Sequence, residues 1–176
     1  DLWKNSIEYM HDAVYYYSLW NGDYPYKQCT AVDGTISAGG GMEYPNVTII
    51  GESGNAKALE EVIMHEVGHN WFYGMLGSNE RDHAWMDEGI NSHNELRYMR
   101  TKYPEYNMLL GNLPKFIKKT FDLEDYSNKQ IIGEMMYFMN AWTGKDQPIE
   151  LHSAEYTDMN YGGIVYMKTA IVFDYL

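Results

Sequence analysis

The stretch EVIMHEVGHNWFYG, residues 61–74, decides the expected fold. It places His65 and His69 four residues apart, with Glu66 directly after the first of them. Apolar residues recur around it at helical spacing: Leu59, Val62, Ile63 and Val67. This pattern predicts an amphipathic helix that begins near residue 56. Because residues four apart share one helical face, with Cβ atoms about 5–6 Å apart, both imidazoles can reach one point.

Two imidazoles on one helical face are a typical metal-binding pair, and zinc is the metal most often bound this way. Glu66 is rotated by about 100° from His65, so it flanks the metal position instead of occupying it. A carboxylate placed there can take a proton from water that the metal activates. An ordinary helix with two surface histidines is the alternative that the pattern leaves open.

The segment AWMDEGIN, residues 84–91, supplies Glu88 as a candidate for the third ligand, and an acid that complements the dipole at a helix N-terminus is the alternative for this residue. Eighteen residues separate His69 from Glu88, and the loop at 77–84 permits an antiparallel return of the chain. Two histidines and one glutamate leave a fourth position open, which is the arrangement of catalytic zinc. Asp87 is interpreted differently, as an acid that complements the dipole at a helix N-terminus. Cys29 is the only cysteine, so a cysteine zinc cluster is excluded.

Composition narrows the class of protein. The chain has 176 residues, enough for one domain with its own core, and its formal net charge is −12. That acidity argues against nucleic-acid binding and favours cationic ligands. No apolar run reaches the length of a membrane span. The expected order is a helix over 2–20, strands over 26–32 and 46–50, and then helices near 56–75, 84–103, 106–121, 128–141 and 163–176. This order predicts an α+β fold.

Four segments together resemble the gluzincin aminopeptidases, the family of aminopeptidase N. The His-Glu-x-x-His motif, with eighteen residues between His69 and Glu88, has that family's spacing, and HNWFYG (69–74) and AWMDEGIN (84–91) are similar to its flanking segments. GGGMEYP (39–45) resembles its Gly-x-Met-Glu-Asn exopeptidase motif, and YGGIVYMK (161–168) resembles its catalytic tyrosine segment. The resemblance implies a thermolysin-like zinc metallopeptidase catalytic domain, with a small N-terminal sheet followed by a mainly helical lobe.

The resemblance also implies roles for individual residues. His65, His69 and Glu88 would hold one Zn²⁺ ion, and Glu66 would be the general base. Tyr166 would donate a hydrogen bond to the oxyanion, and Tyr161 matches a second active-site tyrosine of some members. Glu43 would bind the free α-amine of a peptide substrate, beside Gly40, Gly41 and Met42, where the glycines let substrate backbone approach.

Departures from the family pattern leave alternatives open. Tyr44 replaces the usual Asn after Glu43, and residues 74–84 differ from the usual segment between the ligands. Residues 1–176 are expected to be a single, truncated catalytic domain whose partner N-terminal and C-terminal domains are missing, and such a piece is expected to be weakly active or inactive. A thermolysin-type zinc endopeptidase and a catalytically silent peptide-binding domain are the alternative functions. The cellular compartment is not determined by the sequence.

Overall fold

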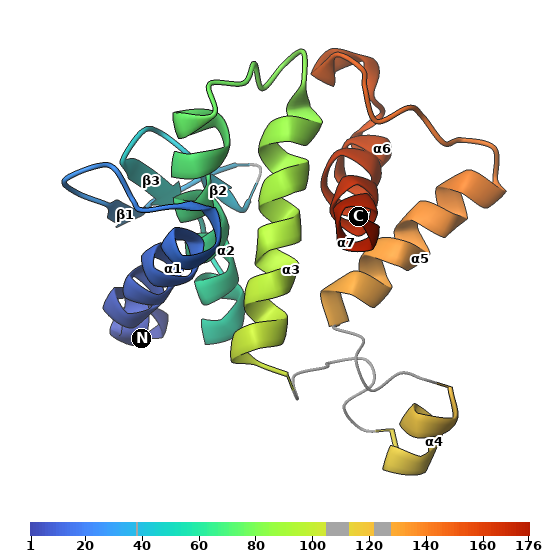
Figure 1. The fold of residues 1–176 in the computed structure, drawn as a ribbon, viewed down its shortest axis with the longest axis horizontal. Coiled ribbons are helices and arrows are strands. Elements are labelled where there is room, and N and C mark those ends of the chain that lie inside the picture. The colour runs from blue at the N-terminus through green and yellow to red at the C-terminus, as the bar shows by residue number, and fades with distance from the viewer. Residues whose placement is uncertain (38, 105–112, 122–127) are drawn as a thin grey trace.

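A computed structural model describes residues 1–37, 39–104, 113–121 and 128–176, with side chains from 133 onward in the last range (Figure 1). The helices, in chain order, are a 3₁₀ turn Leu2–Asn5, α1 Ser6–Asn21, α2 Ala56–Gly68, α3 Ile90–Lys102, α4 Lys115–Thr120, α5 Asn128–Trp142, a 3₁₀ turn Ser153–Glu155, α6 Asp158–Asn160 and α7 Thr169–Tyr175. Three π-helical segments adjoin them: η2 Asn70–Met75, η3 Trp85–Gly89 and η5 Tyr161–Lys168. The strands are β1 Thr30–Asp33, β2 Gly41–Met42 and β3 Val47–Ile50. The described part of the chain is mostly helical with one small sheet, which confirms the α+β prediction.

The sheet has the order β1-β3-β2. β1 pairs in parallel with β3, with Thr30 opposite Val47, while β2 pairs antiparallel with β3, with Gly41 opposite Ile50. β2 is therefore an edge strand, and it contacts α2 directly. An edge strand leaves backbone N–H and C=O groups unpaired on its outer side. The segment that carries Glu43 thus lies where the sheet meets the histidine helix.

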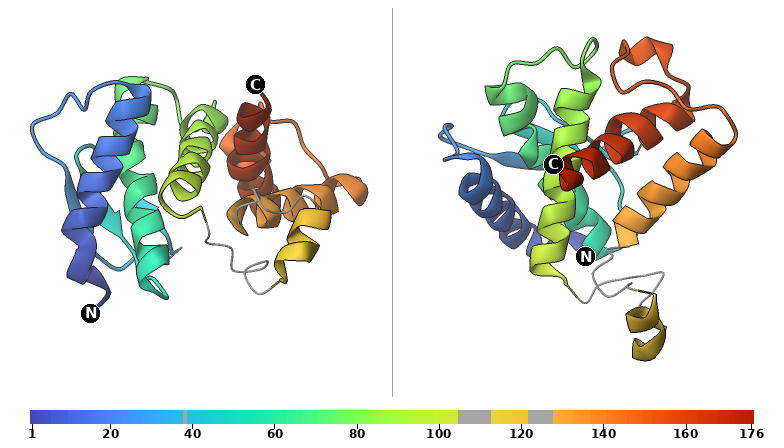
Figure 2. Two further views of the ribbon diagram at one scale, coloured as in Figure 1. Left: turned by 60° about the horizontal axis from the view of Figure 1, so that its bottom comes forward. Right: turned by 45° about the vertical axis from the view of Figure 1, so that its right-hand side comes forward.

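The main core lies between α1, α2, α3 and the inner face of the sheet, and these elements lie side by side in both views (Figure 2). Its buried side chains are Tyr9, Ala13, Tyr17, Ile50, Leu59, Ile63, Met64, Val67, Trp71, Tyr98 and Met99. Three residues of the predicted apolar face of α2 are buried as expected, and Val62 is half-buried at the cavity described below. Burial of these apolar side chains is the main force that holds α2 in place.

The histidine helix ends in a sharp bend. Phe72 and Tyr73 leave helical geometry, and Tyr73 has a φ of +93°, in the left-handed region that bulky residues seldom adopt. The indole N–H of Trp71 donates to the carbonyl of Gly22 at 2.8 Å, and the N–H of Gly74 donates to the carbonyl of His69 at 2.9 Å. These bonds fix the bend and direct the chain toward Glu88.

The C-terminal helices form a second layer against α3. α7 and η5 pack on α3 and η3, and α5 packs on η5 (Figures 1 and 2). A second apolar cluster of Ala84, Tyr156, Ile164 and Val165 fixes η5 beside η3. The helices expected at 84–103, 128–141 and 163–176 are present, with η3 and η5 as π-helical first turns. Of the helix expected at 106–121, residues 106–112 lie outside the described part, and α4 is present at Lys115–Thr120.

No helix in the described ranges is long and apolar enough to cross a membrane.

Candidate metal centre

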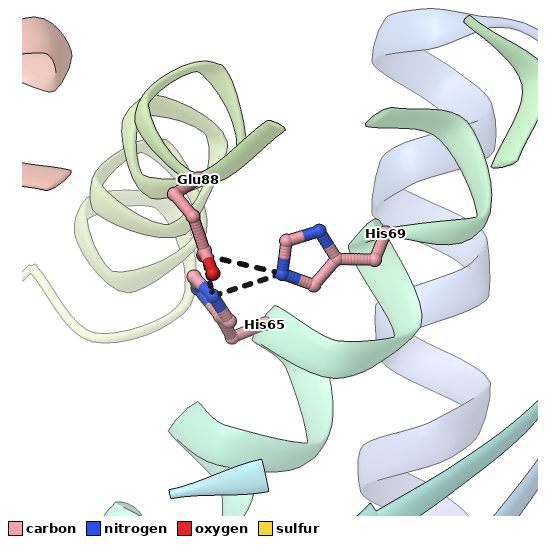
Figure 3. A group of neighbouring side chains, drawn as sticks. All are labelled: His65, His69 and Glu88. Carbon is pink, nitrogen blue, oxygen red and sulfur yellow. Dashed lines mark hydrogen bonds and ion pairs between the residues drawn. The ribbon is translucent and has the colours of Figure 1, made fainter. Parts of the chain in front are cut away.

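His65, His69 and Glu88 converge on one point (Figure 3). His65 lies in the last turn of α2, His69 is the C-cap residue of that helix, and the carboxylate comes from η3. Glu88 Oε2 lies 3.0 Å from His65 Nε2 and 3.3 Å from His69 Nε2, and the two Nε2 atoms are 3.2 Å apart. The structure thus brings together the three residues that the spacing predicted as ligands.

The remaining ring nitrogens are held by carboxylates. His65 Nδ1 lies 3.0 Å from Glu95 Oε2, and His69 Nδ1 lies 2.6 Å from Asp87 Oδ1. Because an ionised carboxylate only accepts hydrogen bonds, each Nδ1 carries the proton and donates it. Each Nε2 is then free to serve as a metal ligand, which is the usual support for histidines at zinc sites. Two nitrogens and one oxygen are donors that suit zinc, so the residues present fit this ion.

The charges at this point favour a cation. Burial alone would raise the pKa of Glu88, but the His69 and His65 rings hold it well below its usual value. Burial alone would lower the pKa of His69, but Glu88 and Asp87 raise it well above its usual value. Both carboxylates therefore favour a second proton on the ring, at Nε2. A bound metal would replace this Nε2 proton, which links metal affinity to pH.

A hydrogen-bonded chain behind the ligands fixes the spacing of α2 and α3. The Asn91 amide donates to the His65 carbonyl at 2.7 Å, and the Tyr17 hydroxyl donates to Asn91 Oδ1 at 2.6 Å. Gly68 makes this contact possible, because a Cβ at that position would lie 2.1 Å from Asn91 Oδ1 and 2.4 Å from the Tyr17 ring. Tyr17, Gly68 and Asn91 thus join α1, α2 and α3 directly beneath the ligands.

Glu66 lies next to the three predicted metal ligands, but its carboxylate is not part of the group that His65, His69 and Glu88 form. Its side chain is buried, with 6% of the residue exposed, and its Oε2 has no hydrogen-bond partner among the described residues. Burial raises the pKa of Glu66 to about 7, against the opposing effect of the two histidines. A carboxylate with that pKa can accept and release a proton near neutral pH.

Glu43 and the glycines before it form the opposite wall. One oxygen of Glu43, one of Glu66 and a ring nitrogen of His69 all lie within 4.8 Å of one another. Gly40 has a φ of +72°, and Gly41 brings β2 so near α2 that a Cβ there would lie 2.4 Å from the Glu66 carboxyl. Burial raises the pKa of Glu43, although His69 opposes this.

The third wall is formed by η5. The Tyr166 ring lies 6.0 Å from the His65 ring and 5.8 Å from the Tyr161 ring, measured between centroids. Burial and the charge of Glu88 raise the pKa of Tyr166 well above its usual value. The same two causes raise the pKa of Tyr161 to about 12. Both phenols therefore remain protonated, and thus able to donate, at neutral pH.

These walls enclose a cavity of about 720 Å³. It is lined by the predicted site residues Gly40, Gly41, Met42, Glu43, His65, Glu66, Glu88, Tyr161 and Tyr166. Of the ten residues predicted for the site, only His69, which is 2% exposed, is not among the lining residues. The cavity volume lies in the range usual for small-molecule and peptide subsites.

Two supporting carboxylates were not predicted from the sequence. Asp87 lies in the first turn of η3, as predicted, and it also hydrogen-bonds His69, a role that the helix-dipole interpretation did not include. Glu95 was not singled out, although it lies seven residues after Glu88 and four after Asn91, a spacing that places all three on one helical face. Two further polar residues of α3 do not support a ligand: Ser92 Oγ has no partner among the described residues, and His93 packs on Phe173.

Comparison with known proteins agrees with this geometry. The family model described as the peptidase family M1 domain matches residues 6–176. No solved structure matches the chain significantly. Because the family model covers nearly the whole sequence, the chain belongs to peptidase family M1 and is a metallopeptidase domain.

Proposed function

We propose that the protein is a zinc aminopeptidase, which hydrolyses the first peptide bond of a chain with a free N-terminus. One Zn²⁺ ion would be held by His65, His69 and Glu88. The observation that carries the proposal is the closeness of Glu43 to Glu66 and His69, all within 4.8 Å. In a peptide only one Cα separates the α-amine from the first carbonyl carbon. A group that binds the amine must therefore lie next to the catalytic groups, and Glu43 does.

Zinc, when bound, supplies Lewis acidity, which polarises a carbonyl and makes water a stronger nucleophile at neutral pH. The chain supplies the proton transfers. Glu66 takes a proton from the attacking water and passes it to the leaving amine. Its burial and its unpartnered Oε2 support this role, because the pKa of about 7 lets it accept a proton and give it up again.

Glu43 sets the position of the cut. Its carboxylate pairs with the substrate ammonium, and a charge-assisted bond of this kind is about twice as strong as a neutral one. Gly41 and Met42 of the edge strand and Gly40 just before it lie beside Glu43, and the glycines leave room for the substrate backbone. An N-blocked peptide lacks the charge that Glu43 binds.

Tyr166 stabilises the oxyanion of the tetrahedral intermediate. Its phenol stays protonated because its pKa is raised, and it stands over His65 at the cavity wall. A single donor to an oxyanion is worth about 3 kcal/mol in well-studied cases. Tyr161 packs edge-on against Tyr166 and keeps its ring in place.

Single-turnover assays with zinc-loaded protein in excess test this proposal, because they detect slow cleavage. Alanyl peptides with a free amine should be cut and their N-acetylated forms should not. Glu66→Gln should retain zinc and lose at least 100-fold in the cleavage rate, since general-base catalysis contributes about 10²–10⁴-fold. Cleavage of the acetylated peptides would instead identify a thermolysin-type endopeptidase. Peptide binding without any cleavage would identify a silent binding domain.

A further inference from the structure

The loop between the two halves of the metal site carries a further carboxylate into the cavity. Glu80 lies eight residues before Glu88, in the segment that departs from the family pattern. One oxygen each of Glu43, Glu80 and Asp87 lie within 4.8 Å of one another, and all three residues line the cavity. Like charges this close repel one another unless a cation lies between them.

A second observation in the same cavity points to a ligand. Glu66 is 94% buried, given its exposed fraction of 6%, and its Oε2 has no partner in the described chain. Glu43 has an oxygen within 4.8 Å of Glu66 on one side and within 4.8 Å of Glu80 on the other. A buried acceptor without a partner costs free energy unless a bound donor satisfies it. Glu43 therefore links Glu80 to the place where substrate reacts.

The loop holds Glu80 in position. The Asn79 side chain accepts from the N–H groups of Arg81 and Asp82, at 3.0 and 3.4 Å, and it donates to the Asp82 carboxylate at 2.7 Å. The carbonyl of Arg81 accepts from the N–H of Ser153 at 2.7 Å, which ties the loop to the segment before η5. A fixed loop loses little entropy when a ligand binds.

We infer that Glu80 and Glu43 together bind the α-ammonium of the substrate, with Glu80 as the second anion. This inference rests on the proposed aminopeptidase function. Asp87 is committed to His69 Nδ1, so two carboxylates remain for the ligand. Two oxygens suit an ammonium with three N–H donors, whereas a hard metal ion takes six or more oxygen ligands. The acidic loop would thus supply free-amine specificity.

Binding to a catalytically inactive protein tests the inference separately from turnover. In a zinc-loaded Glu66→Gln background, calorimetry measures the dissociation constants of Ala-Ala-Ala and N-acetyl-Ala-Ala-Ala. Glu80→Gln should reduce the ratio of the two dissociation constants, acetylated over free amine, by about tenfold. This effect lies at the low end of what a hydrogen bond to a charged group contributes, because Glu80 is exposed to solvent. The acetylated peptide should bind as before. Glu61→Gln is the matched control, because Glu61 faces the same cavity outside the carboxylate group, and it should change both affinities equally.

The outcomes separate the two ideas. If the Glu80-containing protein prefers the free amine and Glu80→Gln keeps that preference, the inference falls and the aminopeptidase proposal stands. If no preference exists at the start, both fall. Zinc content should stay at one ion per chain in Glu80→Gln, and a second ion that this substitution removes would overturn the ammonium assignment in favour of a metal.

Discussion

Gly68→Ala sets two opposing effects against each other directly beneath the metal centre. Gly68 is the last residue of α2, and alanine is favoured over glycine inside a helix by about 1 kcal/mol. Helix propensity alone therefore predicts a more stable protein. The structure predicts the opposite, because a Cβ at this position would lie 2.1 Å from Asn91 Oδ1 and 2.4 Å from the Tyr17 ring.

The clash outweighs the propensity. Tyr17 and Asn91 are both 0% exposed, so neither can move into solvent. Overpacking of a close-packed core costs about 1–3 kcal/mol. Loss of the buried bond between the Tyr17 hydroxyl and Asn91 Oδ1 costs about 1–3 kcal/mol more. After the gain in propensity is subtracted, the net loss in the free energy of unfolding is about 3 kcal/mol, which for this chain length lowers Tm by about 6–12 °C.

Urea and thermal unfolding measure this loss. Gly54→Ala is the control, because a Cβ at that position meets no atom within 4 Å, and its stability should stay within about 0.5 kcal/mol. Displacement of Asn91 should also release its bond to the His65 carbonyl and weaken zinc binding. A Gly68→Ala protein about 1 kcal/mol more stable than the parent would refute the packing argument.

Three further predictions concern other charged groups. Asp87→Asn removes the anion that orients His69 and should weaken zinc binding about 10–100-fold, measured by competition with a chromogenic chelator; an unchanged affinity would exclude that role. Glu60→Ala should cost about 3 kcal/mol in urea unfolding, because it leaves Tyr98, Tyr103 and Lys102 without a buried acceptor to which each donates at 2.6 Å; a loss below 1 kcal/mol would contradict this. The hydrogen bond from Arg100 lowers the pKa of Asp174, so this pair stabilises the fold fully above the ordinary carboxyl pKa of about 4 and loses that effect as pH falls through the lower folded pKa. Asp174→Asn should therefore shift the urea midpoint at pH 7 and shift it less at pH 3, and an equal shift at both would disprove the linkage.

The metal centre could be predicted from the sequence because its ligands follow local rules. The four-residue spacing of His65 and His69 fixes their relation on any α-helix, so only the approach of Glu88 depended on tertiary structure. The loop between η2 and η3 is long enough to bring η3, and with it Glu88, back beside the two histidines. The sequence also predicted α1 and α2 from their apolar spacing, because both helices bury one face against the core.

The supporting residues were harder to predict because their roles depend on distances between elements. Asp87 looks like any acid near a helix N-terminus until the bend at Phe72 and Tyr73 places His69 beside it. Glu80 lies in an exposed loop, where acids are common, and only the position of β2 brings Glu43 near it. The roles of Glu43, Glu66 and Tyr166 in catalysis stay predictions that rest on placement and on resemblance.

The most direct measurement is diffraction from crystals of the zinc-loaded protein, collected on both sides of the zinc absorption edge. One strong anomalous peak should lie between the Nε2 atoms of His65 and His69 and the carboxylate of Glu88. Glu88→Ala crystals should lose or greatly weaken that peak. A zinc peak elsewhere, or a peak at this position that does not depend on Glu88, would contradict the assignment of these three residues as the metal ligands.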